Sequence, residues 1–97
     1  MPDSVSDPVA NACPVCEALL GFEPWKGESA SDEICPSCGI QFGYNDARRE
    51  LRAAVYDEWR KAWLANDRKP FLGEAWRRVS AEVAAAARRS SGRNRAT

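Results

Sequence analysis

Cys13-Pro14-Val15-Cys16 and Cys35-Pro36-Ser37-Cys38 are two copies of one short motif, a pair of cysteines three positions apart that begins Cys-Pro. Residues 17–34 separate the two copies in a chain of 97 residues. Proline fixes φ near the value that a tight turn needs, so each copy can turn both of its sulfurs toward one point. Two C-x2-C pairs separated by about 15 to 20 residues are typical of a tetrahedral zinc centre with four thiolate ligands. The sequence therefore predicts one metal site, with ligands at Cys13, Cys16, Cys35 and Cys38.

The residue that follows each motif differs between the two copies. Gly39 follows the second motif, whereas Glu17 follows the first. A left-handed backbone at this position costs a non-glycine residue roughly 1 kcal/mol or more. We call each CPxC motif with its turn a knuckle, and we therefore expect the first knuckle to be less regular than the second. We also expect the Glu17 carboxylate to point away from a centre whose thiolates and divalent ion together carry net negative charge, or to find a basic partner.

Four cysteines could also form two disulfides, a redox-active pair or an iron centre. Residues 1–12 contain neither the basic start nor the apolar core of a secretory signal, which argues against two disulfides. A CPxC pair also occurs in thioredoxin-like oxidoreductases, but the acidic, proline-bearing segment before Cys13 predicts no strand for such a site. Iron in a rubredoxin-like centre stays open, because the same ligand set holds both metals. We predict Zn²⁺, with Fe as the alternative.

The composition argues against catalysis. The chain has no histidine, which excludes mixed Cys/His zinc centres and a histidine general base. Four thiolates fill a tetrahedral ion and leave no open position for water or substrate. No serine or carboxylate stands beside a partner that would activate it, so we expect turns, caps and solvated faces. The sequence predicts no enzyme and no catalytic residues.

Length and composition predict one small domain between loose ends. We expect a disordered N-terminal segment over residues 1–10, a single zinc-stapled domain over 11–89, and a basic disordered tail over 90–97. The domain divides into a zinc-knuckle lobe, residues 11–45, and two helices within 46–89. No segment approaches the roughly twenty apolar residues of a membrane span, so we expect no membrane association. Reduced thiols bound to metal predict a cytoplasmic location.

The fold class that we predict is α+β, with a four-cysteine zinc-knuckle or ribbon lobe and a short antiparallel β-sheet followed by two α-helices. The lobe should form short strands at residues 18–22, 33–34 and 40–44, with a polar loop over 24–32. Phe42 and Tyr44 should then share one face and cover the metal or pack on the helix that follows. An aromatic platform for stacking nucleic-acid bases is the alternative for this pair.

A first helix is predicted to begin after Asn45 and Asp46, either of which could cap it, and to end at Asn66. Its apolar stripe should face the lobe and consists of Leu51, Val55, Trp59, Ala62 and Trp63. Its opposite face should be solvated and carries Arg49, Arg52, Arg60 and Lys61.

A second helix is predicted to begin between Leu72 and Glu74 and to run to Arg88. Its narrow apolar edge comprises Trp76, Val79 or Ser80, Val83, Ala86 and Ala87. The small residues near its end suit close packing or a partner helix. The sequence leaves open whether this helix packs on its own lobe or on another chain, and it leaves the oligomeric state open.

Charge is balanced overall but segregated along the chain. Residues 1–46 hold eight acidic residues and one basic residue, whereas residues 47–97 hold thirteen basic and six acidic residues. The halves should attract, and a basic helix face can dock on the acidic lobe. The arginines near the C-terminus, Arg88, Arg89, Arg93 and Arg95, could also contact phosphate groups. A protein partner is favoured, and nucleic acid is the alternative partner.

The stretch ICPSCGIQFGYND, residues 34–46, and the later YDEWRKAWLAN, residues 56–66, resemble a group of small bacterial cysteine-rich proteins. In these zinc-ribbon-like proteins a CPxCG knuckle precedes an F-G-Y/F-D-D-like stretch and then a helix with spaced aromatic residues. The resemblance covers about residues 11–66 and implies the four cysteines as metal ligands, but it implies no particular activity. Glu17 and Asn45 depart from the pattern.

Together these observations predict a small intracellular structural-zinc protein that acts as a protein-binding module. One alternative is a nucleic-acid-binding zinc-ribbon protein that uses the arginine-rich C-terminal region. The other alternative is a rubredoxin-like iron protein for electron transfer.

Overall fold

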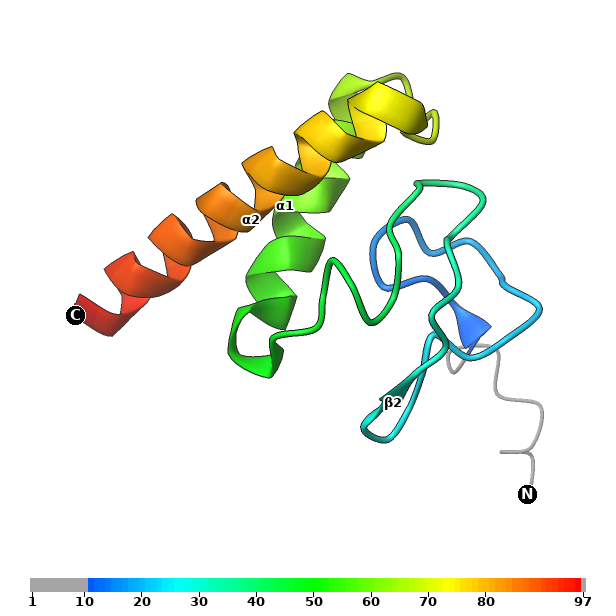
Figure 1. Cartoon of the computed structure of the whole chain (residues 1–97), viewed down its shortest axis with the longest axis horizontal. Helices are drawn as coiled ribbons and strands as arrows, with labels where there is room; N and C mark the ends of the chain where they lie inside the picture. The colour runs from blue at the N-terminus through cyan, green and yellow to red at the C-terminus, as the bar shows by residue number, and fades with distance from the viewer. Residues whose placement is uncertain (1–10, 97) are drawn as a thin grey trace.

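The structure is a computed structural model that describes residues 11–96, so the predicted N-terminal segment lies outside the described residues. An irregular knuckle lobe, residues 11–45, packs beside two helices (Figure 1). The elements in chain order are β1 (Trp25–Lys26), β2 (Ser29–Ala30), the 3-10 turn η3 (Arg49–Leu51), α1 (Arg52–Ala65) and α2 (Gly73–Ala96). This is the α+β composition that the sequence predicts, with a two-stranded antiparallel hairpin and two helices.

The strands lie elsewhere than predicted. β1 and β2 pair antiparallel, with Trp25 opposite Ala30, inside the segment that was predicted to be a polar loop. Gly27, at φ 60°, provides the left-handed first position of the two-residue connection. The strands predicted at 18–22, 33–34 and 40–44 are wrong. These segments form only single bridges in the described structure, between Ala12 and Leu19 and between Ile34 and Gln41. The two backbone segments that flank each knuckle turn diverge after one residue pair.

The aromatic residues of the third predicted strand do not share one environment. Phe42 is completely buried, whereas the Tyr44 side chain is 60% exposed. Tyr44 instead lies against Trp76 of α2, with ring centroids 5.6 Å apart. The residues after Gln41 form turns and no strand. Residues two positions apart share a face only in a strand, so the two rings lie in different environments here.

The first helix begins later than predicted, through η3 and then α1. Asn45 and Asp46 do not cap it, because their side chains close the turn before it. Asn45 Oδ1 accepts a hydrogen bond from the backbone N–H of Gln41 at 2.8 Å, and Asp46 Oδ1 accepts one from Gly43 at 2.6 Å. The predicted end is confirmed, since Asn66 follows the last residue of α1. The buried residues of the predicted stripe are Leu51, Val55 and Trp59.

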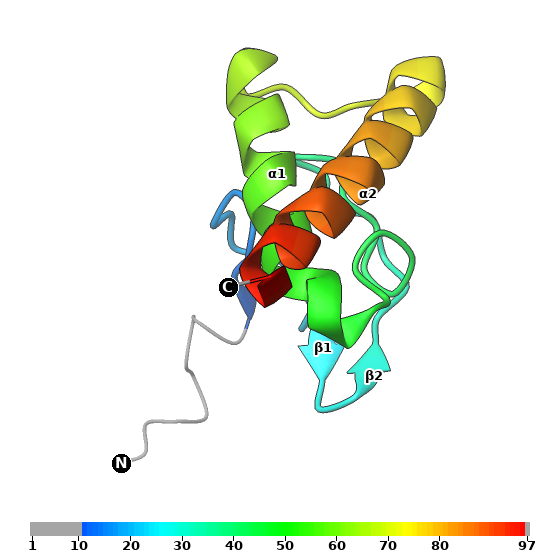
Figure 2. The same cartoon turned by 90° about the vertical axis from the view of Figure 1, so that its left-hand side faces the viewer.

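The second helix is longer than predicted. α2 starts at Gly73, within the predicted interval, but continues beyond Arg88 to Ala96, through the segment that was expected to be disordered. Extending a helix that already exists costs little, because each added residue gains a hydrogen bond without a new nucleation step. α2 crosses α1 of its own chain and reaches η3 (Figure 2), which answers the question of where it packs. Neither helix in the described part of the chain combines the length and apolar character needed to cross a bilayer.

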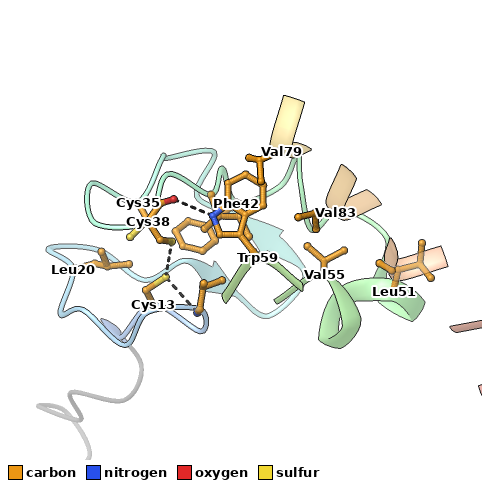
Figure 3. Close-up of a cluster of buried hydrophobic side chains, with 13 residues drawn as sticks. Cys13, Leu20, Cys35, Cys38, Phe42, Leu51, Val55, Trp59, Val79 and Val83 are labelled. Carbon is orange, nitrogen blue, oxygen red and sulfur yellow. Dashed lines mark hydrogen bonds between the residues drawn. The ribbon is translucent and has the colours of Figure 1, made fainter. Parts of the chain in front are cut away.

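One apolar core joins the lobe to both helices. Figure 3 shows it, with Cys13, Cys38, Phe42 and Trp59 toward the knuckle lobe and Leu51 on the opposite side of the cluster. Part of the predicted apolar edge of α2 is buried within its own chain, with Val79, Val83 and Ala87 at 5%, 4% and 0% exposure. The buried members of the core are Cys13, Val15, Leu20, Cys35, Cys38, Ile40, Phe42, Leu51, Val55, Trp59, Val79, Val83 and Ala87.

Candidate metal centre

The structure brings the four predicted cysteines together at one point. Their sulfur atoms all lie within 4.8 Å of one another, and none of them forms a disulfide. The Cys13 and Cys38 sulfurs are 3.8 Å apart, and those of Cys16 and Cys35 are 3.7 Å apart. A tetrahedron with metal–sulfur bonds of about 2.3 Å has edges of about 3.8 Å, whereas a disulfide needs about 2.05 Å. The cluster could therefore hold a metal ion, and its shape is consistent with a zinc-ribbon-like knuckle.

The two knuckle turns follow the same backbone pattern. The N–H of Glu17 donates to the Cys13 carbonyl at 2.8 Å, and the N–H of Gly39 donates to the Cys35 carbonyl at 2.9 Å. Both following residues adopt a left-handed backbone, with φ 68° at Glu17 and 88° at Gly39. The expectation that the first knuckle is less regular is therefore wrong, because the turn imposes the backbone on Glu17 despite a strain of about 1 kcal/mol. The Glu17 side chain is exposed, as expected.

Backbone N–H groups inside each turn point at sulfur. Val15 N lies 3.4 Å from the Cys13 sulfur, and Ser37 N lies 3.4 Å from the Cys35 sulfur. Donors of this kind stabilise thiolates, which are the form of cysteine that binds metal. The first knuckle and the second each supply one such donor to their leading cysteine.

Crowding of the sulfurs perturbs their ionisation. Hydrogen bonds from Cys13 and Cys38 lower the pKa of Cys35 to about 2, whereas the hydrogen bond to Cys35 raises the pKa of Cys13 to about 12. Hydrogen bonds to both neighbours also raise the pKa of Cys38 far above its ordinary value. The opposite directions of these pKa values, lowered for Cys35 and raised for Cys13 and Cys38, reflect the cost of a second negative charge beside a buried thiolate. A bound cation would supply the positive charge that four thiolates in one place require.

Both helices are attached to the second knuckle by tryptophan side chains. Three indole N–H groups each donate to a different backbone carbonyl of this turn: Trp59 to Cys38 at 2.9 Å, Trp63 to Ser37 at 3.0 Å and Trp76 to Gly39 at 2.8 Å. We call these three residues the tryptophan triad. A hydrogen bond of this kind contributes about 1 kcal/mol, and a buried indole N–H without an acceptor is more costly. The triad therefore ties the position of α1 and α2 to the shape of one knuckle.

Gly39 allows this close approach. A Cβ atom at this position would lie 3.0 Å from both the backbone nitrogen and the backbone oxygen of Phe71, in the connection between the helices. Its φ of 88° is also a conformation that side-chain-bearing residues rarely adopt. The second knuckle can pack directly against the helix connection only because glycine stands there.

The first knuckle is attached to α1 by an arginine. Arg60 Nε donates to the Val15 carbonyl at 2.8 Å, and its second guanidinium nitrogen donates to the Pro14 carbonyl at 2.8 Å. The prediction of an ordinary solvated face is thus wrong for Arg60. It is also wrong for Arg52, whose guanidinium lies 3.9 Å from the centre of the Trp25 ring. Arg60 brings positive charge to a turn that presents two sulfurs, which favours an anionic thiolate centre.

A buried carboxylate holds the hairpin to α1. Asp46 is completely buried, and its Oδ2 accepts hydrogen bonds from Trp25 Nε1 at 2.9 Å and from the Tyr56 hydroxyl at 2.6 Å. With the Gly43 N–H on Oδ1, the carboxylate has three donors. Burial and the Asp46 carboxylate raise the pKa of Tyr56, which keeps that hydroxyl protonated and able to donate. Asp46 is therefore a structural acceptor that fixes the lobe against the helix.

The cluster is closed on most sides. Cys13, Cys35 and Cys38 are at most 1% exposed, and Cys16 is the partly exposed member. A site in which all four sulfurs point at one centre suits structural metal binding, since a catalytic ion keeps a free coordination position. The same S4 ligand set accommodates zinc or iron.

Comparison with known proteins identifies no relative: no family model matches the chain, and no curated protein or solved structure is similar enough to count as a match. The resemblance to small bacterial CPxCG proteins therefore stays a prediction. The structure gathers the four cysteines and adds two connections that the sequence did not predict, the tryptophan triad and Arg60. The spacing of Trp59 and Trp63, one helical turn apart on the stripe that was predicted to face the lobe, is the signal that could have indicated the first of these.

Proposed function

We propose that this protein is a small zinc-stabilised binding module, whose four-cysteine centre holds a helical surface in place for a protein partner. The observation that carries the proposal is the attachment of both helices to knuckle carbonyls by the tryptophan triad. A metal ion that fixes the knuckles would fix these carbonyls and, through them, α1 and α2. The ion then has a structural role and takes no part in a reaction.

The ligand set supports zinc, or iron as the alternative, in preference to calcium and magnesium. Four thiolates are soft ligands, which select zinc or iron over the hard ions calcium and magnesium. In a small chain, a structural zinc site contributes folding free energy directly, because the site does not exist in the unfolded state. A reducing compartment such as the cytoplasm would keep the thiols available for it.

The identity and role of the metal are tested on purified protein without added iron. We expect one zinc per chain by elemental analysis and native mass spectrometry, and a colourless solution. Chelation should abolish the cooperative thermal transition, with recovery on return of Zn²⁺. A red protein with one iron and a reversible redox couple would instead support electron transfer. A melting transition that chelation leaves unchanged would refute the structural role.

The binding role is tested with affinity purification from the source cells, using wild type and Trp76→Ala. We expect one partner at constant stoichiometry on the wild-type protein, resistant to nuclease, and reduced recovery on Trp76→Ala. Circular dichroism and zinc content establish that the variant is folded, and Leu64→Ala is a matched change at a 47% exposed apolar position on α1. The proposal is contradicted if the wild-type protein recovers no partner. It is also contradicted if Leu64→Ala reduces recovery of the partner as much as Trp76→Ala does.

Nucleic-acid binding is the second candidate, because of the charge of α2. Residues 73–96 include six arginines and two glutamates, on a single helix. Fluorescence anisotropy with a labelled single-stranded oligonucleotide tests this candidate at low salt. Binding that weakens steeply with salt and is lost when residues 88–97 are deleted supports it, whereas no binding at low salt removes it.

A further inference from the structure

A groove runs between α2 and the turn that precedes α1. Its volume is about 300 Å³, and its walls include Tyr44, Trp76, Ala81 and Ala84. This volume is at the small end of the range for ligand pockets. It accommodates one or two side chains of a partner, while the small alanines of α2 let the partner backbone approach the helix closely.

The walls of the groove are held in position by contacts within the chain. Trp76 is fixed by its hydrogen bond to the Gly39 carbonyl at 2.8 Å, and its ring packs against Tyr44. Asn45 Nδ2 donates to the Ser80 hydroxyl at 3.1 Å, which joins the turn to α2 along the groove. A groove formed before binding avoids the entropy cost of ordering its side chains when a partner arrives.

The α2 side of the groove is basic. Arg77 lines it, and Arg88 follows eleven residues later, which places it on the same face of α2 about 16 Å further along the axis. Both side chains are exposed, and within the described part of the chain neither forms an ion pair. An apolar groove with unpaired cations on its helix is complementary to an apolar side chain flanked by carboxylates.

We propose that this groove binds an acidic peptide segment of a partner protein, which inserts a large apolar side chain between Tyr44 and Ala84 and places carboxylates near Arg77 and Arg88. The inference rests on the proposed binding function and specifies the chemistry of the partner. Exposed aromatic surface of this kind is typical of side chains that anchor an interface, and Tyr44 is 60% exposed.

A long polyanion fits this surface less well than a short acidic segment. The groove lies where the basic helix meets the knuckle lobe, and residues 11–46 hold six acidic residues and one basic residue. Four thiolates with one divalent ion would add further negative charge to the lobe. An extended polyanion bound at the groove would experience the acidic lobe as well as the helix, whereas a short segment bound along α2 responds mainly to the arginines within a Debye length of roughly 8 to 10 Å.

The experiment uses the metal-loaded full chain and a phage-displayed library of random linear peptides, followed by titration of a labelled synthetic peptide from the enriched set. Ala81→Glu places a carboxylate in the groove at an exposed helical position. Ala53→Glu makes the same change at an exposed position of α1 outside the groove and is the matched control. Arg77→Glu reverses the nearest charge.

We expect enriched peptides that combine one aromatic or leucine residue with at least two acidic residues. Their affinity should fall about tenfold or more with Ala81→Glu and with Arg77→Glu, which corresponds to about 1.4 kcal/mol, and should not change with Ala53→Glu. Peptides that bind but are insensitive to Ala81→Glu would overturn the groove assignment and leave the binding function intact. If no peptide is enriched, both the groove assignment and the proposed binding function are contradicted. Displacement of the peptide by a single-stranded oligonucleotide of higher affinity would overturn the choice of an acidic segment in favour of nucleic acid.

Discussion

Replacing Asp46 with asparagine removes one charge from a completely buried side chain with almost no change in shape. The carboxylate accepts the Trp25 indole and the Tyr56 hydroxyl on Oδ2 and the Gly43 N–H on Oδ1. Asparagine has one acceptor oxygen, and its NH₂ group must take the place of the other. The Tyr56 hydroxyl can rotate and accept from that NH₂ group. An N–H of Trp25 or Gly43 cannot, so one buried donor loses its acceptor in either orientation.

The cost follows from these contacts. A buried N–H without an acceptor costs about 1 to 3 kcal/mol, and each remaining hydrogen bond loses about 1 kcal/mol when its acceptor becomes neutral. Release from the penalty of burying a charge offsets part of this total. We therefore expect Asp46→Asn to lower the free energy of unfolding by about 3 kcal/mol, a large fraction of the roughly 5 to 15 kcal/mol typical of domains. At about 4 to 8 °C per kcal/mol for a domain of this size, the Tm should fall by about 12 to 24 °C.

Urea and thermal unfolding of the metal-loaded protein, followed by circular dichroism, measure this loss. Asp57→Asn is the control, since Asp57 is an exposed acid of α1 whose ion pair with the exposed Lys61 is screened by solvent and should contribute little. In a double-mutant cycle, Tyr56→Phe should cost about 1 kcal/mol less in the Asp46→Asn background than in wild type, because the two side chains share a hydrogen bond. A loss below about 0.5 kcal/mol for Asp46→Asn, or a loss equal to that of Asp57→Asn, would refute the reasoning.

Three further outcomes are expected. Cys38→Ser should abolish metal binding and cooperative folding, because this position is completely buried. Cys16→Ser, at the partly exposed position, should retain one metal at reduced affinity by elemental analysis. Equal effects of the two substitutions would contradict this order. Trp63→Phe should lower the free energy of unfolding by about 1 kcal/mol through the lost bond to a knuckle carbonyl, and an unchanged Tm would show that the bond contributes nothing. The pKa of Tyr56 is raised by burial, so the folded state holds this proton more tightly than the unfolded state, and stability should decline as pH rises above about 10. Tyr56→Phe should reduce that decline in urea unfolding at successive pH values, and a wild-type slope in the variant would exclude Tyr56 as its source.

Local patterns of the sequence predicted the parts of the molecule that depend on local geometry. The spacing of the cysteines indicated a single cluster, and the structure gathers all four sulfurs within 4.8 Å. The helical periodicity of Leu51, Val55 and Trp59 indicated the buried stripe of η3 and α1, and these residues are buried. In both cases the relevant contacts follow from turns and helices that form over a few residues.

The polar contacts between distant segments were not predictable in this way. Asp46 has the sequence context of a helix cap, yet its carboxylate binds Trp25 and Tyr56, residues that only the folded lobe brings together. Arg60 has the context of a solvated helix face, yet it binds two carbonyls about 45 positions earlier in the chain. The regularity of the first knuckle was also not predictable, because the turn imposes its backbone on Glu17 against the local preference of that residue. The preference of Glu17 against a left-handed backbone is worth about 1 kcal/mol, less than the bonds that close the turn.

The same long-range contacts connect the candidate metal centre to the groove. Trp76 forms one wall of the groove, and its indole donates to the carbonyl of Gly39, the residue that follows the last cysteine of the cluster. The conformation of Gly39 is set by the knuckle turn, through the hydrogen bond from its N–H to the Cys35 carbonyl. If an ion bound by the cluster were lost, the turn would lose its cross-link and the indole a fixed acceptor, so the wall and its contact with Tyr44 should loosen together. The metal would then control binding indirectly, because partner affinity would depend on occupancy of a site that the partner does not contact.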